Sequence, residues 1–245
     1  MKITLTIIIS KFILKKMNKR GKFIVIEGID GSGKGTQTEL LVERLKKENK
    51  EVVIDDYPHY ETSFWGKHAG RMLTGEFGPL FGISPYMAVL PYILDEADGS
   101  KKIIGPALEA GKTVVSNRYF TSNVHQIAKK EESEREIYAN WLWEAGYNQT
   151  GIIKPDLVLV LLVDPLICRE NILKKAERNY VKGQVMDQAE ENFNHQMETA
   201  KEYKKMAQKE PEMWVLIDCC RERKLMSREE INEVIWKELK KRNLL

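Results

Sequence analysis

The segment from Gly28 to Lys34 carries the residue types that bind a phosphate group. Three glycines, at positions 28, 31 and 33, allow a tight turn that brings backbone N–H groups close to an anion. Lys34 adds a full positive charge at the same place. The spacing G-x-x-x-x-G-K, counted from Gly28, therefore predicts a loop that holds the phosphates of a nucleotide.

The residues on either side of this loop predict the elements that position it. Phe23 to Ile26 are apolar without interruption, which is typical of a strand buried on both faces of a parallel sheet. From Lys34 onward, leucines at positions 40, 41 and 45 recur at helical spacing. The positive end of this helix would point at the loop and favour an anion there.

The wider string I-E-G-x-D-G-S-G-K-x-T-Q, residues 26–37, resembles the opening of thymidylate kinases, which phosphorylate dTMP. The second half of this string, G-S-G-K-G-T-Q, is also similar to the corresponding loop of adenylate kinases. The resemblance implies ATP as the phosphoryl donor, together with Mg²⁺. One departure is Gly35, because the motif usually has Ser or Thr there to hold Mg²⁺, and Thr36 comes one place late. The residues implied to bind ATP are Gly28, Ile29, Asp30, Gly31, Ser32, Gly33, Lys34, Gly35 and Thr36.

A second informative stretch runs from Thr113 to Tyr119. Thr113 to Val115 predict a buried strand, which places Asn117 and Arg118 just beyond its carboxyl end. In a doubly wound parallel sheet, ligands bind at that edge. The glycine loop follows its strand at the same edge, so the two segments are expected to meet in one crevice.

This stretch also resembles the family, whose members carry Asp-Arg-Tyr here, with the arginine between the donor and acceptor phosphates. Asn117 replaces the aspartate, and with Gly35 it makes two weakened metal contacts. The sequence therefore predicts an active kinase with altered metal dependence, and leaves the metal ligands unknown.

The segment Pro85–Ala97 predicts a helix that Pro91 kinks, and it resembles the family's acceptor helix. Tyr92 fits the aromatic residue that stacks on thymine, and Asp95 fits the aspartate of the Asp-Arg pair that follows. Glu96 stands where the family has the arginine that meets the 4-carbonyl of the base. The resemblance implies three more residues that bind the acceptor: Asp30, Pro58 and Asn123.

Glu96 leaves two alternatives open. An arginine donates to a carbonyl and a carboxylate cannot, whereas a carboxylate accepts from the exocyclic amine of cytosine. The acceptor is then a cytosine nucleotide or is poorly discriminated. In the other alternative, Glu96 turns away and other groups read the base. The family often has an arginine just beyond Pro58; here His59 follows and is predicted to be a surface loop residue.

The basic run from Lys174 to Gly183 lies where kinases of this class place a mobile lid. Arg178 is the expected lid arginine and the third catalytic residue beside Lys34 and Arg118, with Lys182 as a weaker candidate. Asp187 and Glu190 are expected to cap the next helix.

Three further strands are predicted around residues 51–56, 154–165 and 213–217, with helices between all five. The fold class is therefore α/β: a P-loop NTPase three-layer sandwich with a five-stranded parallel sheet and a helical lid. Residues 133–145 predict an amphipathic helix closed by Gly146. Asp164 and Ser227 are expected to cap the two later helices.

The composition, 42% hydrophobic and 31% charged over 245 residues, suits one α/β domain at 21–245. Residues 1–20 are expected to be a loose N-terminal extension or to precede the true start, with Met17 as the alternative. The 39 basic and 36 acidic residues are intermixed, so no nucleic-acid partner is implied.

The apolar run at 3–14 is too short and interrupted for a membrane span. Three cysteines without paired spacing indicate reduced thiols and a cytoplasmic location. The family resemblance implies a possible homodimer.

The predicted function is that of a nucleoside monophosphate kinase that transfers the γ-phosphate of ATP to dTMP, giving dTDP. The nucleophile is an anionic phosphate oxygen, so no general base is required. Besides a kinase for another pyrimidine deoxynucleotide such as dCMP, two alternatives remain. A deoxynucleoside kinase would need a carboxylate base, for which Glu27 is the candidate. A non-catalytic nucleotide sensor would bind ATP without turnover.

Overall fold

The computed structural model describes residues 20–174, 188–222 and 224–245. The strands are β1 (Phe23–Glu27), β2 (Val52–Asp56), β3 (Thr113–Asn117), β4 (Leu157–Leu162), β5 (Trp214–Asp218), β6 (Cys220–Arg221) and β7 (Lys224–Leu225). The α-helices are α2 (Lys34–Lys47), α3 (Phe64–Leu73), α4 (Pro85–Ala88), α5 (Leu90–Gly99), α6 (Gly105–Glu109), α7 (Val124–Ile127), α8 (Glu132–Trp143), α9 (Pro165–Leu173), α10 (Gln188–Glu191), α11 (Phe193–Lys209) and α12 (Arg228–Lys241). Short 3₁₀ or π segments are η1 (Leu80–Gly82), η2 (Ser100–Ile104), η3 (Phe120–Asn123) and η4 (Glu144–Gln149).

The central sheet has five parallel strands in the order β2-β3-β1-β4-β5. β1 therefore lies in the middle, between β3 and β4, with Ile26 beside Asn117 in the register. The carboxyl ends of β1, β2 and β3 share one edge, since the strands are parallel. The predicted five-stranded parallel sheet is confirmed.

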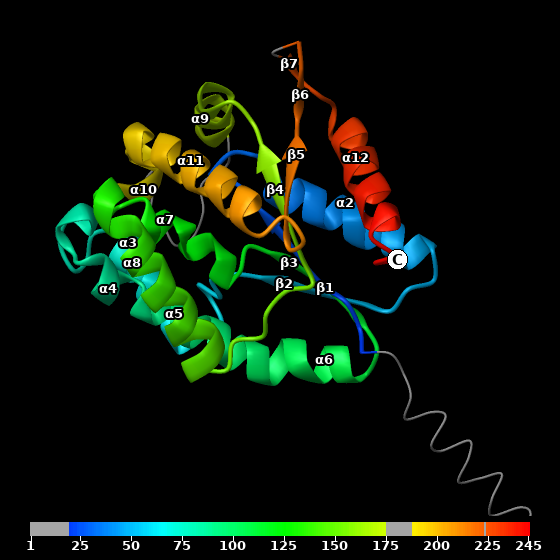
Figure 1. Cartoon of the computed structure of the whole chain (residues 1–245), viewed down its shortest axis with the longest axis horizontal. Helices are drawn as coiled ribbons and strands as arrows, with labels where there is room; N and C mark the ends of the chain where they lie inside the picture. Colours follow the sequence, from blue (N-terminus) through cyan, green and yellow to red (C-terminus); the bar gives the residue numbers. More distant parts are fainter. Residues whose placement is uncertain (1–19, 175–187, 223) are drawn as a thin grey trace, which may run out of the picture.

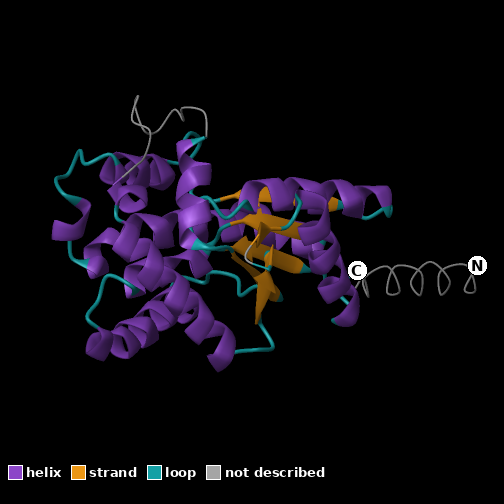
Figure 2. Ribbon diagram, turned by 90° about the horizontal axis from the view of Figure 1, so that it is seen from above, coloured by secondary structure: helices purple, strands orange, loops and turns teal. Residues whose placement is uncertain are grey.

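Helices cover both faces of this sheet (Figures 1 and 2). Alternate side chains of β1 enter two separate cores. Phe23 and Val25 join the core beneath α7, α8 and α11, whereas Ile24 and Ile26 join the core beneath α2 and α12. Strands buried on both faces explain the uninterrupted apolar runs of the sequence, and the three-layer sandwich is as predicted.

The helix predicted to end at Gly146 does not end there. α8 stops at Trp143, and the chain continues as η4 through Gln149. Gly146 is buried against Phe120, and a Cβ at this position would lie 2.1 Å from the ring. A glycine is needed here because the Phe120 ring leaves no room for a side chain, and not because a helix ends here. The hairpin of β6 and β7 was not predicted.

Other local expectations hold. Asp164 caps α9 by accepting a hydrogen bond from the Leu166 backbone, and Ser227 forms a capping box with Glu230 at α12. The helix expected at 85–97 is divided at Val89, two residues before Pro91, into α4 and α5. Two expected parts of the chain lie outside the described residues. They are residues 1–19 of the extension and the lid region with Arg178, Lys182 and Asp187. Arg20, the last residue of that extension, pairs with Asp156 at 3.1 Å. Within the described ranges, no helix has both the length and the apolar character needed to cross a bilayer.

A half-buried histidine, whose side chain is 15% exposed, joins the end of β2 to α5, which corrects the expectation that His59 is a surface loop residue. Its Nε2 donates to Asp55 at 2.8 Å, and its Nδ1 donates to Asp95 at 3.2 Å. The backbone N–H of His59 also donates to Asp95, as does the Ser63 hydroxyl. Burial alone would lower the pKa of His59, but the two carboxylates outweigh it and raise the pKa from 6.5 to about 10.

This arrangement predicts a pH-dependent contribution to stability. Since the pKa of His59 is raised in the folded protein, its contribution is complete below pH 6.5 and is lost as the pH rises towards about 10. We expect the difference in free energy of unfolding between wild type and His59→Gln, measured by urea denaturation, to shrink steadily over this range. Other titrating groups are common to both proteins and cancel. A difference that stays constant from pH 6 to pH 10 would contradict a cationic His59.

Candidate functional site

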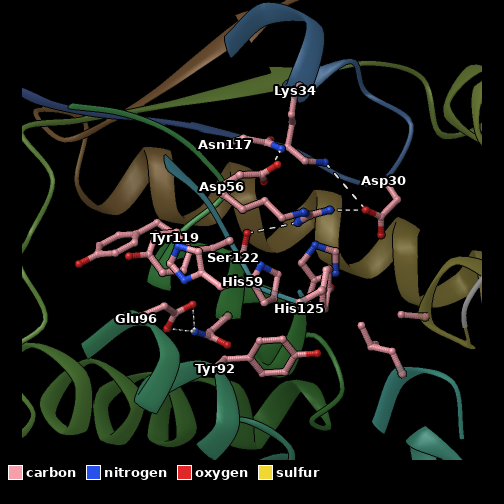
Figure 3. A pocket seen from close by; sticks show the side chains of 18 of the residues that line it. Asp30, Lys34, Asp56, His59, Tyr92, Glu96, Asn117, Tyr119, Ser122 and His125 are labelled. Carbon is pink, nitrogen blue, oxygen red and sulfur yellow. Dashed lines mark hydrogen bonds and ion pairs between the residues drawn. The ribbon is translucent and has the colours of Figure 1, made fainter. Parts of the chain in front are cut away.

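A cleft of about 630 Å³ lies at the carboxyl edge of β1, β2 and β3 (Figure 3). It brings together most of the site residues predicted from the sequence: Asp30, Gly31, Gly33, Lys34, Gly35, Thr36, Pro58, Tyr92, Glu96, Arg118 and Asn123. Gly28, Ile29 and Ser32 do not line it, and Arg178 lies outside the described residues. Segments almost 100 residues apart in the sequence thus meet at one site.

The glycine loop joins β1 to α2 and is packed tightly against α9. Gly31 has a φ of 81°, and a Cβ there would lie 2.1 Å from the carbonyl oxygen of Cys168. Only glycine fits such a position. The Lys34 ammonium donates to the carbonyl oxygens of Gly28 at 3.0 Å and Ile29 at 2.9 Å. The lysine thus lies along the loop, with its charge close to Asp30, at 3.9 Å.

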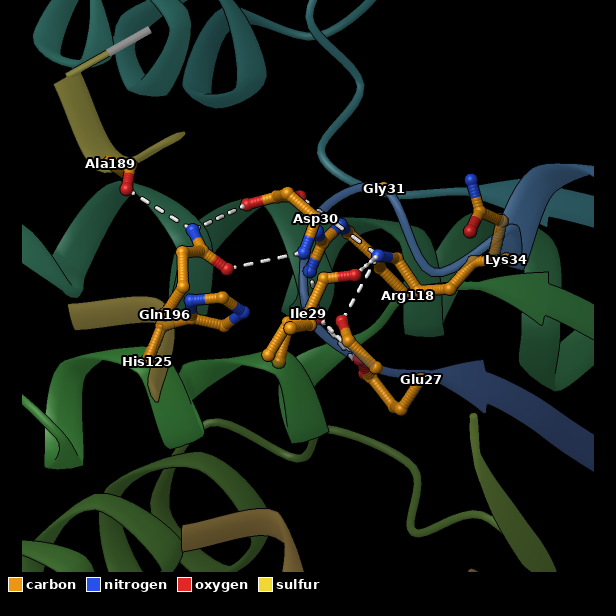
Figure 4. A network of polar contacts seen from close by, with 12 residues as sticks. Glu27, Ile29, Asp30, Gly31, Lys34, Arg118, His125, Ala189 and Gln196 are labelled. Atoms are coloured by element: carbon orange, nitrogen blue, oxygen red, sulfur yellow. Dashed lines mark hydrogen bonds and ion pairs between the residues drawn. The ribbon is translucent and has the colours of Figure 1, made fainter. Parts of the chain in front are cut away.

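Arg118 lies at the centre of the cleft, directly after β3. Its φ is 62°, which is uncommon for a residue with a side chain. The guanidinium donates to Asp30 and, at 3.2 Å, to the hydroxyl of Ser122. Burial would raise the pKa of Asp30, but the charges of Arg118 and Lys34 outweigh it and hold the pKa well below its usual range. Gln196 of α11 also donates to Asp30, at 3.1 Å (Figure 4).

Glu27 is fully buried behind this cleft and does not line it. Its carboxylate accepts hydrogen bonds from Thr121 at 2.7 Å, Ser122 at 2.8 Å and Tyr203 at 2.8 Å. Three hydroxyl donors satisfy the carboxylate inside the protein. This placement is wrong for the general base that a deoxynucleoside kinase would need, because a base must reach the substrate hydroxyl.

The two weakened metal contacts expected from the sequence are neighbours in space. A Cβ at Gly35 would lie 3.9 Å from the amide nitrogen of Asn117, and that nitrogen donates to Asp56 at 2.8 Å. The amide oxygen of Asn117 is buried and has no hydrogen-bond partner among the described residues. A carboxylate beside an unpartnered amide oxygen suits Mg²⁺, which usually takes one or two protein oxygens plus substrate phosphates. Within the described ranges, no group of three His, Cys, Asp or Glu side chains could hold a metal unaided.

The far end of the cleft carries the residues expected to read the base. Tyr92 and Glu96 come from α5, and Asn123 comes from η3 (Figure 3). The amide nitrogen of Asn123 donates to the Glu96 carboxyl at 3.2 Å and to the Phe120 carbonyl at 3.0 Å. Glu96 is only 2% exposed, and its burial, together with the charge of Asp95, raises its pKa well above the usual range. Glu96 therefore lines the cleft with a raised pKa, which favours its protonated form.

Sequence reasoning missed a group of polar residues on the cleft wall. His125, Gln126 and Lys129 come from α7 and the turn after it, and His195 comes from α11. Their spacing matches no catalytic or metal-binding motif. The predicted role of Asn123 could have indicated His125, Gln126 and Lys129. Residues that closely follow a predicted substrate-binding residue can line the same cleft.

Known proteins resemble this chain along most of its length. The family model "Thymidylate kinase" matches residues 26–241. A probable thymidylate kinase of Thermococcus kodakarensis is 34% identical over 199 residues, covering 79% of this chain and 88% of that relative. A thymidylate kinase of Bifidobacterium longum is 29% identical over 199 residues, covering 81% of this chain and 89% of the relative.

The structure of thymidylate kinase from Candida albicans shares the fold, with a TM-score of 0.69 at 21% identity, and the match covers 92% of this chain and 93% of that one. The family match extends over nearly all of the described strands and helices. It includes the glycine loop, Arg118 and α5. This chain belongs to the thymidylate kinase family.

Proposed function

We propose that this chain phosphorylates dTMP with ATP, giving dTDP, and that the described cleft holds both substrates. The observation that carries the proposal is the convergence of Lys34, Arg118 and Asp30 with Tyr92 and Asn123 in one cleft. The first group suits phosphates, and the second group suits a pyrimidine. Family membership agrees with this activity.

Catalysis is proposed to rest on position and charge. The acceptor phosphate is already anionic near neutral pH, with a second pKa of about 6, so no protein base is needed. The glycine-loop backbone and Lys34 hold the donor phosphates, and Arg118 stabilises the charge that develops between donor and acceptor. Arg178 is proposed to add a further charge from the lid.

Mg²⁺ is proposed as the metal, held by Asp56 and the amide oxygen of Asn117 together with the substrate phosphates. When bound, it would neutralise the charge of the ATP phosphates. The hydrogen bond from the Asn117 amide to Asp56 fixes both groups at the edge of the cleft. Asn117 thus serves in place of the aspartate of the family pattern by orienting Asp56.

Glu96 is proposed to read the base as a hydrogen-bond donor. A neutral carboxylic acid can donate to the 4-carbonyl of thymine, whereas an ionised one cannot. The Asn123 amide nitrogen donates to both carboxyl oxygens of Glu96, at 3.5 Å and 3.2 Å, which holds this carboxyl in place in the cleft. Glu96 therefore replaces the family arginine as a donor, which favours thymine over cytosine.

The cysteines and one exposed apolar surface bear on the cell compartment and the assembly. Cys168, Cys219 and Cys220 are free thiols, which suits a reducing, cytoplasmic location. Large apolar side chains are exposed on α4, α5 and α8, and such a surface suits a homodimer. They are Tyr86, Met87, Leu90, Ile137 and Trp141.

The activity is tested by an ADP-release assay with ATP and Mg²⁺ against dTMP, dCMP, dUMP, AMP and thymidine. We expect dTMP to be preferred, and Lys34→Ala and Arg118→Ala to lower kcat by about 100-fold or more, as for the loss of one transition-state donor. Lys47→Ala, at the exposed end of the same helix α2, should leave kcat unchanged. Near-normal turnover of folded Lys34→Ala would refute this site, and binding of ATP without any turnover would favour a sensor.

The role of Glu96 is tested by comparing dTMP and dCMP. We expect wild type to prefer dTMP by about tenfold or more. Glu96→Gln keeps an N–H donor and should keep that preference, whereas Glu96→Met should lower kcat/KM for dTMP by about tenfold, the value of one hydrogen bond.

The matched control is Asp98→Asn, on the same helix, whose carboxylate pairs with Lys102 near the surface. This variant should behave as wild type. A wild-type preference for dCMP would show that Glu96 acts as an ionised acceptor instead.

A further inference from the structure

Asp30 divides its two carboxylate oxygens between different partners. Its Oδ1 accepts from the Arg118 guanidinium and lies 3.9 Å from the Lys34 ammonium. Its Oδ2 accepts from Nε2 of Gln196 at 3.1 Å (Figure 4). One oxygen thus faces the two cations at the phosphate end of the cleft, and the other is held by a residue of α11. The rotation of the carboxylate is therefore fixed, together with the direction in which Oδ1 points.

Gln196 also holds the backbone of the same residue. Its Oε1 accepts from the backbone N–H of Asp30 at 3.3 Å, and its Nε2 donates a second hydrogen bond, to the Ala189 carbonyl, at 3.1 Å. The side-chain amide thus uses its oxygen and both hydrogens of its nitrogen. The partners define its orientation, because a carboxylate and a carbonyl only accept and a backbone N–H only donates. An ionised glutamate has the same shape but no N–H to offer Asp30 or Ala189.

Gln196 itself does not reach the substrate cleft. It is only 4% exposed and does not line the cleft, whereas Asp30 and Ala189 do. Ala189 packs against the apolar cluster around Leu80, to which Tyr92 also belongs. The amide of Gln196 therefore joins the phosphate end of the cleft to the end that carries Tyr92. Any effect of this residue on a substrate must pass through the groups that it holds.

The Asp30 carboxylate matters because it sets the position of Arg118. The guanidinium donates to Asp30 and to the hydroxyl of Ser122, and both partners come from the loops at the edge of the sheet. A carboxylate that rotates away from this direction would move the guanidinium with it. Misplacing a group near the reacting atoms by about 1 Å can lower a rate by about 100-fold.

We propose that Gln196 is a positioning residue for phosphoryl transfer, which sets the direction of the Asp30 carboxylate and through it the place of the Arg118 guanidinium. This inference rests on the proposed function. Arg118 acts on the charge that develops between donor and acceptor, so its place matters most in the transition state. Loss of Gln196 therefore lowers kcat and leaves the KM for dTMP nearly unchanged.

The first test replaces Gln196 by a side chain of similar length without hydrogen-bond donors. In Gln196→Met we expect kcat with dTMP to fall about tenfold and KM to change by less than about twofold. Gln208→Met, at an exposed position of the same helix, is the matched control and should keep the wild-type kcat. A Gln196→Met protein with normal kcat would overturn the proposal.

A double-mutant cycle separates this role from general support of the fold. In the Asp30→Ala background, Gln196→Met should lower kcat by less than about twofold, because no carboxylate remains to be oriented. A merely structural role would give the same tenfold loss in both backgrounds, and that result would contradict the proposal.

Gln196→Glu adds a readout that depends on pH. The introduced carboxyl is buried beside Asp30, which raises its pKa. When protonated it can donate to Asp30, and when ionised it cannot. We expect the kcat of this variant relative to wild type to rise as the pH is lowered from 8 to 5.5. Impairment by the same factor at every pH would count against the hydrogen bond to Asp30. The other charged or titratable groups around Asp30 are common to both proteins: Arg118, Lys34, His125 and His195.

Failure of the kinase assignment is a separate outcome. If wild type does not phosphorylate dTMP, the proposed function fails whatever the variants do. The cycle of Gln196→Met and Asp30→Ala is then measured on the Kd for ATP by calorimetry, because both residues hold the loop proposed to bind the donor phosphates. Non-additive effects on Kd would support the link between the two residues, and additive effects would overturn it.

Discussion

The buried positive charge of Arg118 is the constraint on which the rest of the site depends. A guanidinium inside a protein must be paired, because an isolated buried charge is very costly. Asp30 supplies the opposite charge, and Ser122 supplies an acceptor. The strand order places β3 beside β1, so the residues that follow the two strands are neighbours at one edge of the sheet. Arg118 is thus fixed by the topology of the sheet before any substrate binds.

The surrounding polar contacts extend outward from this pair. Ser122 also donates to Glu27, and Glu27 accepts from Tyr203 of α11. Gln196 of the same helix donates to Asp30. The long helix α11 is therefore attached to both ends of the network, and the loop after β1 cannot move without disturbing it.

The sheet and the phosphate loop were predictable because their signals are local. Strands buried on both faces appear as apolar runs, and glycine spacing reports a backbone shape. His59 was misjudged because its role depends on Asp95, 36 residues away, and no local pattern marks it. Gly146 was misread for the same reason, since its close neighbour Phe120 lies in another segment. The polar wall around His125 could not be found from spacing, because α7 and α11 meet only in the folded chain.

The departures from the family pattern fall into two spatial groups rather than being scattered. Gly35 and Asn117 are neighbours, and the Asn117 amide donates a hydrogen bond to Asp56. At the base end, His59 brings a positive charge to Asp95, the neighbour of Glu96. Because His59 balances Asp95, a positive charge is not required at position 96 to offset that carboxylate. In the proposed site, a residue there needs only to donate a hydrogen bond to the base, and the raised pKa of Glu96 favours the protonated form that can do so. The absence of an arginine at position 96 thus occurs beside a carboxylate whose charge His59 already balances.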